Sequence, residues 1–378
     1  MKTPARSSSS PANTRADHMP ALTGIRFFAI LHIFLYHLWS LYNLELDPPF
    51  THLMQSIEKL PELAIRYCSH GWMSTSFFFL LSGFILSYLY WRPDGNLSTS
   101  RRTFWINRFT RIYPIHLIIL IPTGLIMASN YAFDSLAAVA NFAGALIATA
   151  TLTQAWYPPW VPSFSWPTWT LSALIFLYLV TPLSMRILRR LSRRGMFIAL
   201  AILPVLSLIP TLASVFWVEN PHGFSQNESV FIGSLPLFWL PHFVAGLLLA
   251  RAFGIQRGES AWRPQKTRHF AWGDVALLAV IAIALMPDIS NEPLRYFIRH
   301  GLLMPLYMVI TLDLARHHGV AARLFSLPGT GFLGNTGFSI FVWQNLVMAG
   351  CWIALMINPD AWAYQLEIAT LAVIFIGI

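Results

Sequence analysis

The chain has 378 residues, of which 56% are hydrophobic and 11% are charged, and it contains 28 Phe and 15 Trp. A soluble core of this length does not bury so much apolar side chain, so the composition excludes an ordinary soluble domain and indicates a polytopic membrane protein. The net charge of +9 would suit a nucleic-acid partner, but Lys and Arg fall in short blocks between apolar runs. Orientation in the bilayer explains such blocks, and we expect no nucleic-acid partner.

Residues 1–21 are polar and rich in Ser, Pro and Ala, and we expect them to form a disordered cytoplasmic tail. The rest of the chain, 22–378, is predicted to be one all-α membrane domain, a polytopic helical bundle. A bilayer core needs about 20 mostly apolar residues per helix. Ten segments meet this requirement, near 22–43, 72–91, 112–130, 168–188, 196–217, 232–253, 271–287, 299–316, 331–356 and 362–378.

An eleventh, alanine-rich segment from Asp134 to Leu152 decides the orientation of every later helix. If it does not cross the bilayer, the basic blocks all lie on the side of the N-terminus, and most acidic loop residues lie on the other side. This is the positive-inside pattern, so we expect a re-entrant or interfacial helix here and both termini in the cytoplasm. The basic blocks are 92–111, 186–194, 251–268, and Arg316 with Arg323.

The first predicted span carries three polar side chains, in the stretch "RFFAILHIFLYH" (26–37). Arg26 and His37 are eleven positions apart, so a helix places them on one face, about 16 Å apart along its axis. A charge inside a bilayer costs about 2.5 kcal/mol or more, and this pattern usually marks a functional site. The alternatives are that Arg26 reaches the interface and that His37 makes a core hydrogen bond. His32 lies on another face, where a structural role is favoured.

Several further segments share an order with a known family. They are "FFFLLSGFIL" (77–86), "RFTRIYP" (108–114), "WTLSALIFLYLVTP" (169–182), "LPHFVAGLLLAR" (240–251) and "LGNTGFSIFVWQNLV" (333–347). Together with "LTGIRFFAILHIFLYHLW" at the first span, the set resembles the membrane-bound acyltransferase-3 family, whose first helix carries an arginine followed by a histidine. Each motif is short, but their order over nearly the whole chain is specific.

The resemblance implies an O-acyltransferase that moves an acyl group, commonly acetyl, from acetyl-CoA to hydroxyls of cell-surface carbohydrates. In that reading His37 deprotonates the acceptor hydroxyl, and Arg26 is an inner relay between the donor's phosphates and its thioester. Arg108 and Arg111 would hold the CoA diphosphate, because guanidinium groups suit phosphates. The alternative for this pair is a topology signal alone. Acetyl-CoA is then a co-substrate, and we expect no tightly bound cofactor and no metal.

The resemblance also suggests an acceptor and a location. The expected partners are a lipid-linked or polymeric saccharide, as in exopolysaccharide biosynthesis, and the lipid of a bacterial inner membrane. Trp166 and Trp169, in an aromatic stretch on the outer side, are candidates for stacking on sugar rings. An interfacial aromatic belt explains the same residues.

The chain departs from the family at three places. The glutamate usual in the Trp-Ser-Leu segment is replaced by Leu174 or Ile175, the usual Pro-Glu-Phe contains His242, and the common histidine of the ninth helix is Gln344. These departures leave His37 as the principal base, with no carboxylate partner apart from Glu367 in the last predicted span. His70, His116 and His242 are secondary polar candidates.

Two other functions remain open at this point. A transporter or flippase of acyl groups or glycolipids also has polytopic helices with buried charges, but such carriers often show two similar halves with matched broken helices. The sequence shows no such repeat, which favours the enzyme. An acyltransferase-like protein without catalysis is the third reading, because the expected glutamate is missing.

Overall fold

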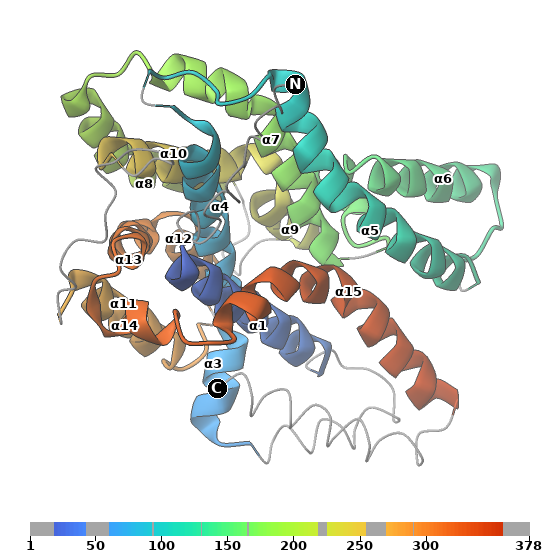
Figure 1. The fold of residues 1–378 in the computed structure, drawn as a ribbon. Helices are drawn as coiled ribbons and strands as arrows, with labels where there is room; N and C mark the ends of the chain where they lie inside the picture. Colours follow the sequence, from blue (N-terminus) through green and yellow to red (C-terminus); the bar gives the residue numbers. More distant parts are fainter. Residues whose placement is uncertain are drawn as a thin grey trace, which may run out of the picture.

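The computed structural model describes residues 19–42, 60–92, 94–129, 131–164, 166–217, 225–254, 270–289 and 291–357. These residues form helices joined by turns, with one isolated bridge between Trp91 and Leu97 and no strand among them (Figure 1). The predicted all-α class is confirmed. Of the predicted disordered tail 1–21, residues 1–18 lie outside the described residues, whereas Pro20 and Ala21 are helical, so the tail was predicted to end too late. The predicted span over 362–378 and Glu367 also lie outside the described residues.

Most helices follow the predicted segments, but the helix predicted from residue 112 begins at Arg101, and the predicted span 232–253 is broken after Ser234. In chain order they are α1 (Pro20–Tyr42), α3 (Glu62–Ser69), α4 (Ser74–Tyr90), α5 (Arg101–Ser129), α6 (Leu136–Ala150), α7 (Trp169–Leu188), α8 (Arg193–Trp217), α9 (Gln226–Ser234), α10 (Leu240–Ala252), α11 (Trp272–Ala284), α12 (Glu292–Phe297), α13 (Met304–Ala315), α14 (Gly319–Leu324) and α15 (Thr330–Ile357). Short 3₁₀ turns join several of them, and a π-helical turn, η7 (Ile298–Leu302), links α12 to α13.

Membrane-crossing length is reached by six of the described helical runs, and by a seventh if one pair of helices bent by 42° is a single span. The predicted count of ten spans and the orientation of the termini therefore stay predictions. The six are Pro20–Ser40, Glu62–Tyr90, Arg101–Ser129, Trp169–Leu188, Arg193–Ala213 and Glu292–Ala315, and the bent pair is Asn227–Ser234 with Pro236–Ala252.

Two apolar helices are shorter than a bilayer core. Helix α6 has 15 residues and α11 has 13, which correspond to about 22 and 20 Å against a core of about 30 Å. The length of α6 agrees with a segment that does not cross. Helix α11 falls short of the span predicted over 271–287, where Pro287 cannot continue a helix.

Glycines set the central helix crossings. A Cβ on Gly83 of α4 would lie 2.0 Å from the carbonyl oxygen of Phe243, and one on Gly246 of α10 would lie 1.9 Å from that of Leu80. The two backbones therefore meet directly, as small residues allow in membrane bundles. Helices α1 and α15 cross in the same way (Figure 1), because a Cβ on Gly334 would lie 2.0 Å from the carbonyl oxygen of Thr23.

Helices α5 and α6 extend to one side of this centre (Figure 1). The Tyr113 hydroxyl donates to the carbonyl of Ala150 at 2.7 Å, and Nε2 of His116 bonds to the carbonyl of Thr149 at 2.8 Å. Because it ties α5 to α6, His116 has a structural role here.

Candidate active site

A cavity of about 150 Å³ lies where α1, α4, α7, α9 and α12 come together. It brings His37 and Trp169, two of the predicted site residues, to one place and adds Arg299, which the sequence reasoning missed. The lining residues are Ile33, Tyr36, His37, Trp72, Thr75, Val161, Trp169, Thr170, Ser229, Val230, Gly233, Ser234, Tyr296 and Arg299.

His37 is oriented by a residue 307 positions away in the chain. Its Nδ1 lies 3.3 Å from Oε1 of Gln344, and the amide side chain is 1% exposed. An amide oxygen only accepts, so Nδ1 donates in this pair, and in the neutral ring Nε2 is then the basic nitrogen. Among the described residues nothing hydrogen-bonds to Nε2. The Gln344 amide thus holds His37 by Nδ1, with Nε2 free of described partners at the wall of the cavity.

Arg299 supplies a positive charge to the same cavity from the π-helical turn η7. Its guanidinium lies over the ring of Trp169 at 5.5 Å and over that of Trp239 at 5.1 Å, which are cation–π distances. Its Nε is buried without a hydrogen-bond partner, and no described carboxylate pairs with the group. The cavity therefore holds a cation whose charge is not neutralised by the described part of the chain, which favours a negative group beside it.

The Arg299 guanidinium packs on a cluster of rings, which we call the aromatic floor: Trp239, Phe79, Trp169 and His300. The ring of Trp239 stacks 4.8 Å from Phe79, lies 5.6 Å from Trp169, and lies 4.7 Å from His300. The rings of His242 and His300 are both fully buried, and their centres lie 6.3 Å apart. His242 therefore packs beneath the cavity and does not line it.

Trp169 has only 5% of its surface exposed, so an aromatic belt facing lipid does not describe it. Its ring is covered by the Arg299 guanidinium, and the residue lines the cavity as part of the aromatic floor. The side chain of Trp166, the other predicted stacking residue, lies outside the described residues.

The predicted arginines form a separate group. Arg26, Arg108 and Arg111 all interact electrostatically with Tyr178, and Arg26 with Arg111 as well. Nη2 of Arg108 donates to the Tyr90 hydroxyl at 2.8 Å, and its guanidinium lies 5.2 Å from the centre of that ring. None of the three arginines lines the cavity, and along α1 Arg26 lies about 16 Å from His37.

His32, also on α1, has both ring nitrogens engaged. Nδ1 lies 2.8 Å from the Ser74 hydroxyl and Nε2 lies 2.7 Å from the carbonyl of Tyr67, whose ring stacks on the imidazole at 4.1 Å. The histidine holds α1 against the start of α4, which is the structural role expected for it.

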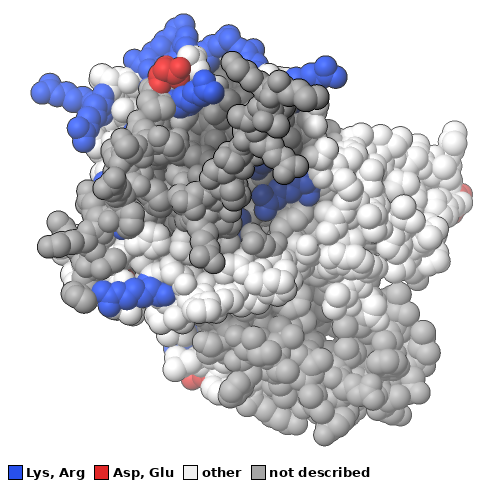
Figure 2. Space-filling model, in the orientation of Figure 1, with Lys and Arg blue, Asp and Glu red and all other residues white. Residues whose placement is uncertain are grey.

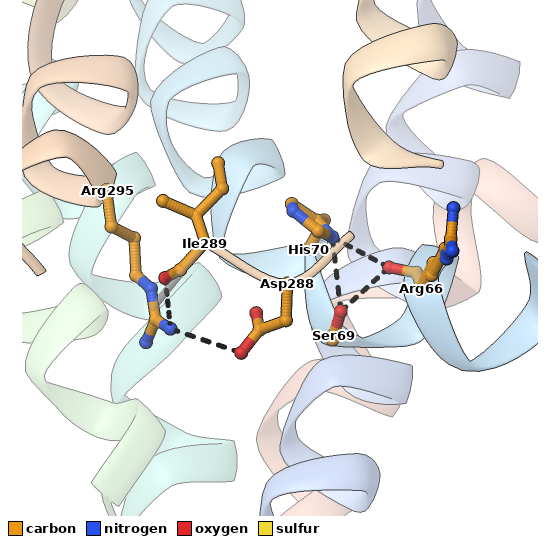
Figure 3. A network of polar contacts seen from close by, with 6 residues as sticks. All are labelled: Arg66, Ser69, His70, Asp288, Ile289 and Arg295. Atoms are coloured by element: carbon orange, nitrogen blue, oxygen red, sulfur yellow. Dashed lines mark hydrogen bonds and ion pairs between the residues drawn. The ribbon is translucent and has the colours of Figure 1, made fainter. Parts of the chain in front are cut away.

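His70 ends the short helix α3 (Figure 3). Its Nδ1 is within 2.8 Å of the carbonyl of Arg66 and within 3.1 Å of the Ser69 hydroxyl. Figure 3 also shows Arg295 beside the neighbouring loop, where it pairs with Asp288 at 3.7 Å. His70 is thus part of a local hydrogen-bond network and lies outside the cavity lining.

Comparison with known proteins places the chain. A sequence model described as "Acyltransferase domain", that of the acyltransferase-3 family, matches residues 19–378. The chain is 32% identical over 251 residues to Acyltransferase MdmB of Streptomyces mycarofaciens, covering 65% of this chain and 60% of that protein. It is 25% identical over 336 residues to Putative acetyltransferase ORF330 of Acidianus two-tailed virus, covering 88% and 84%. No solved structure matches. Because the family match runs from the start of α1 to the end of the chain, the protein belongs to the acyltransferase-3 family of multi-pass membrane proteins.

Proposed function

We propose that the protein is a membrane O-acyltransferase that moves an acetyl group from cytoplasmic acetyl-CoA to a hydroxyl of a cell-surface or exopolysaccharide sugar. The observation that carries the proposal is the pairing, in one cavity, of a histidine with a free Nε2 and an arginine without a counter-charge. The names of the two relatives, an acyltransferase and a putative acetyltransferase, support the reaction class.

The two groups suit the two charges that develop in acyl transfer. Nε2 of His37 takes the proton of the sugar hydroxyl as its oxygen attacks the thioester carbonyl, and the carbonyl oxygen becomes negative. Arg299 stabilises that oxygen, while the Gln344 amide oxygen, bonded at Nδ1, stabilises the imidazolium. When the carbon–sulfur bond breaks, the CoA sulfur leaves as the thiolate and takes the proton back from Nε2.

The cavity is small for a whole substrate. A volume of about 150 Å³ is below the 300 to 1,000 Å³ usual for small-molecule sites, so it suits the reacting ends of donor and acceptor. Its hydroxyls are partly engaged already: Thr170 donates to the carbonyl of Pro167 at 2.7 Å, and Ser234 to that of Val230 at 2.6 Å. In our proposal the rest of the saccharide lies outside the cavity.

The donor is proposed to enter from the side that carries Arg26, Arg108 and Arg111. Guanidinium groups bind phosphate oxygens through paired hydrogen bonds, and here three of them share one region around Tyr178. Arg26 lies on the same helix as His37, so the acyl arm of the donor would follow α1 from the phosphates to the base.

The reaction itself is the direct test. Expressing the protein in a strain that lacks it should raise the ester-bound acetyl of the surface polysaccharide, measured by base release and by NMR. Purified protein in detergent should also transfer acetyl from acetyl-CoA to a soluble acceptor sugar. A transporter or flippase would pass the first assay through other enzymes but would form no ester in the second, and that result would overturn the proposal.

The proposal requires the basic end of the bundle to face the cytoplasm of a bacterial inner membrane. In a background with Cys68→Ala and Cys351→Ala, which removes both native cysteines, Arg190→Cys should be shielded from an impermeant maleimide in intact cells and labelled after permeabilisation. Glu62→Cys, on the opposite side in this topology, is the control that should react in intact cells. Labelling of position 190 in intact cells would reverse the orientation.

A further inference from the structure

A second cavity, of about 650 Å³, lies between the loop after α4 and the C-terminal end of α7. We call it the arginine recess. Figure 2 shows Arg side chains gathered along the upper edge of the molecule, where α5 begins, with few acidic atoms among them. The recess is lined by Gly95, Asn96, Leu97, Thr99, Ser100, Arg101, Pro182, Met185, Arg186, Arg189 and Arg190.

The loop that forms one wall is ordered by its own hydrogen bonds. Gly95 has φ +81°, a left-handed conformation, and a Cβ there would lie 2.7 Å from Cβ of Arg189. Nη1 of Arg189 donates to Oδ1 of Asn96 at 3.0 Å. The Asp94 carboxylate accepts from the backbone and side-chain nitrogens of Asn96, and these bonds lower the pKa of Asp94. The wall is thus held together without using the other arginines of the recess.

Three of the four arginines are free to bind a ligand. The side chains of Arg101, Arg186 and Arg190 are exposed and make no hydrogen bond or ion pair with any described residue. Asp94 is the acidic neighbour of Arg189 and does not line the recess. The Ser100 hydroxyl accepts from the backbone nitrogen of Thr103 at 3.1 Å and caps α5, so the positive end of that helix also lies here. Positive charge therefore collects in a concave site, which attracts anions.

We infer that the arginine recess binds phosphate groups. Charge placed only to orient the protein needs neither a cavity nor an ordered wall, and this site has both. Arg108 follows Arg101 by seven residues, about 10 Å along α5. In this arrangement the recess holds the nucleotide phosphates of the acyl donor, and Arg108 holds the part of the donor that follows them. This assignment rests on the proposed function. An anionic lipid headgroup offers the same phosphate chemistry.

A matched pair of double variants tests the site in the full-length protein. Arg186→Gln with Arg190→Gln removes two charges from the recess, whereas Arg193→Gln with Arg194→Gln removes two charges beside it that do not line it. Binding of adenosine 3′,5′-bisphosphate and of short-chain phosphatidylglycerol is measured by calorimetry in neutral detergent. We expect the first variant to weaken binding of at least one probe by about tenfold or more, because charge-assisted hydrogen bonds are lost, and the second to bind as the unaltered protein does.

The two probes separate the two sources of phosphate. Loss confined to the bisphosphate identifies the donor, and loss confined to phosphatidylglycerol identifies a headgroup. If neither probe binds, or if both variants lose binding equally, the recess is not a phosphate site.

The binding assay needs no turnover, so it is independent of the proposed function. A protein that binds the bisphosphate through the recess but transfers no acetyl refutes only the proposed function. Where transfer does occur, the recess variant should raise KM for acetyl-CoA and leave KM for S-acetylpantetheine, which lacks the nucleotide phosphates, unchanged.

Discussion

Replacing His37 with Ala is expected to lower kcat for acetyl transfer by about 10²- to 10⁴-fold, the usual contribution of a general base. The reason is that Nε2 of His37 is a basic nitrogen that faces the cavity and has no partner among the described residues. The measurement is initial rate with purified protein, acetyl-CoA and a soluble acceptor sugar. Because Gln344 is the only hydrogen-bond partner of the ring among the described residues, the variant should stay folded, as thermal unfolding in detergent will show.

The matched control is His317→Asn. His317 follows α13, lies outside the cavity lining, and has φ 57°, a conformation that Asn tolerates. The His317→Asn substitution removes one histidine that has no role in the proposed reaction, so activity should be retained. If His37→Ala keeps full activity while the protein transfers acetyl, His37 is not the base and the mechanism fails.

Arg299→Met is expected to reduce kcat by about 10²- to 10³-fold, the range seen when one group that stabilises an oxyanion is removed. The substitution should leave the stability of the fold unchanged or raise it. A half-buried cation with a buried, unpartnered Nε and no counter-charge among the described residues is costly, and Met keeps much of the length and the packing against Trp169 and Trp239. Loss of activity with an unchanged or raised unfolding temperature is therefore the expected result, and Arg299→Lys, which keeps the charge, should recover part of the rate.

Arg295→Met provides the comparison four residues earlier. Arg295 pairs with Asp288 at 3.7 Å and donates to the carbonyl of Ile289 at 2.9 Å, so its loss should lower stability and leave kcat near that of the unaltered protein. If Arg299→Met instead loses stability in step with activity, and Arg299→Lys recovers neither, then Arg299 only supports the aromatic floor.

The sequence could predict much of the fold because the relevant patterns are local. The spacing of Arg26 and His37 needs only the period of one helix, and α1 carries both over one continuous run. A small residue such as Gly83 permits a close helix crossing, but only the structure shows that the partner is α10. The number of spans was harder to predict, since breaks such as the 42° bend between Ser234 and Pro236 depend on what packs around them.

Only part of the candidate site could be predicted from the sequence. Arg299 stood at the start of a predicted span, and its neighbour Arg295 four residues earlier was the signal that could have drawn attention to it. Gln344 appeared only as a departure from the family. Nothing local links either residue to His37, because hydrogen bonds between helices depend on how the helices cross.

The sequence by itself determined the membrane class, the family, the helical stripe that carries Arg26 and His37, and the basic blocks. Only the tertiary structure decided that His37 meets Gln344 across 307 positions and faces Arg299, and that Trp169 is buried. It also separated Arg26, Arg108 and Arg111 from that cavity and formed the arginine recess from two distant segments. The physical reason is that periodicity and composition act within one helix, whereas a site is made where the faces of several helices meet.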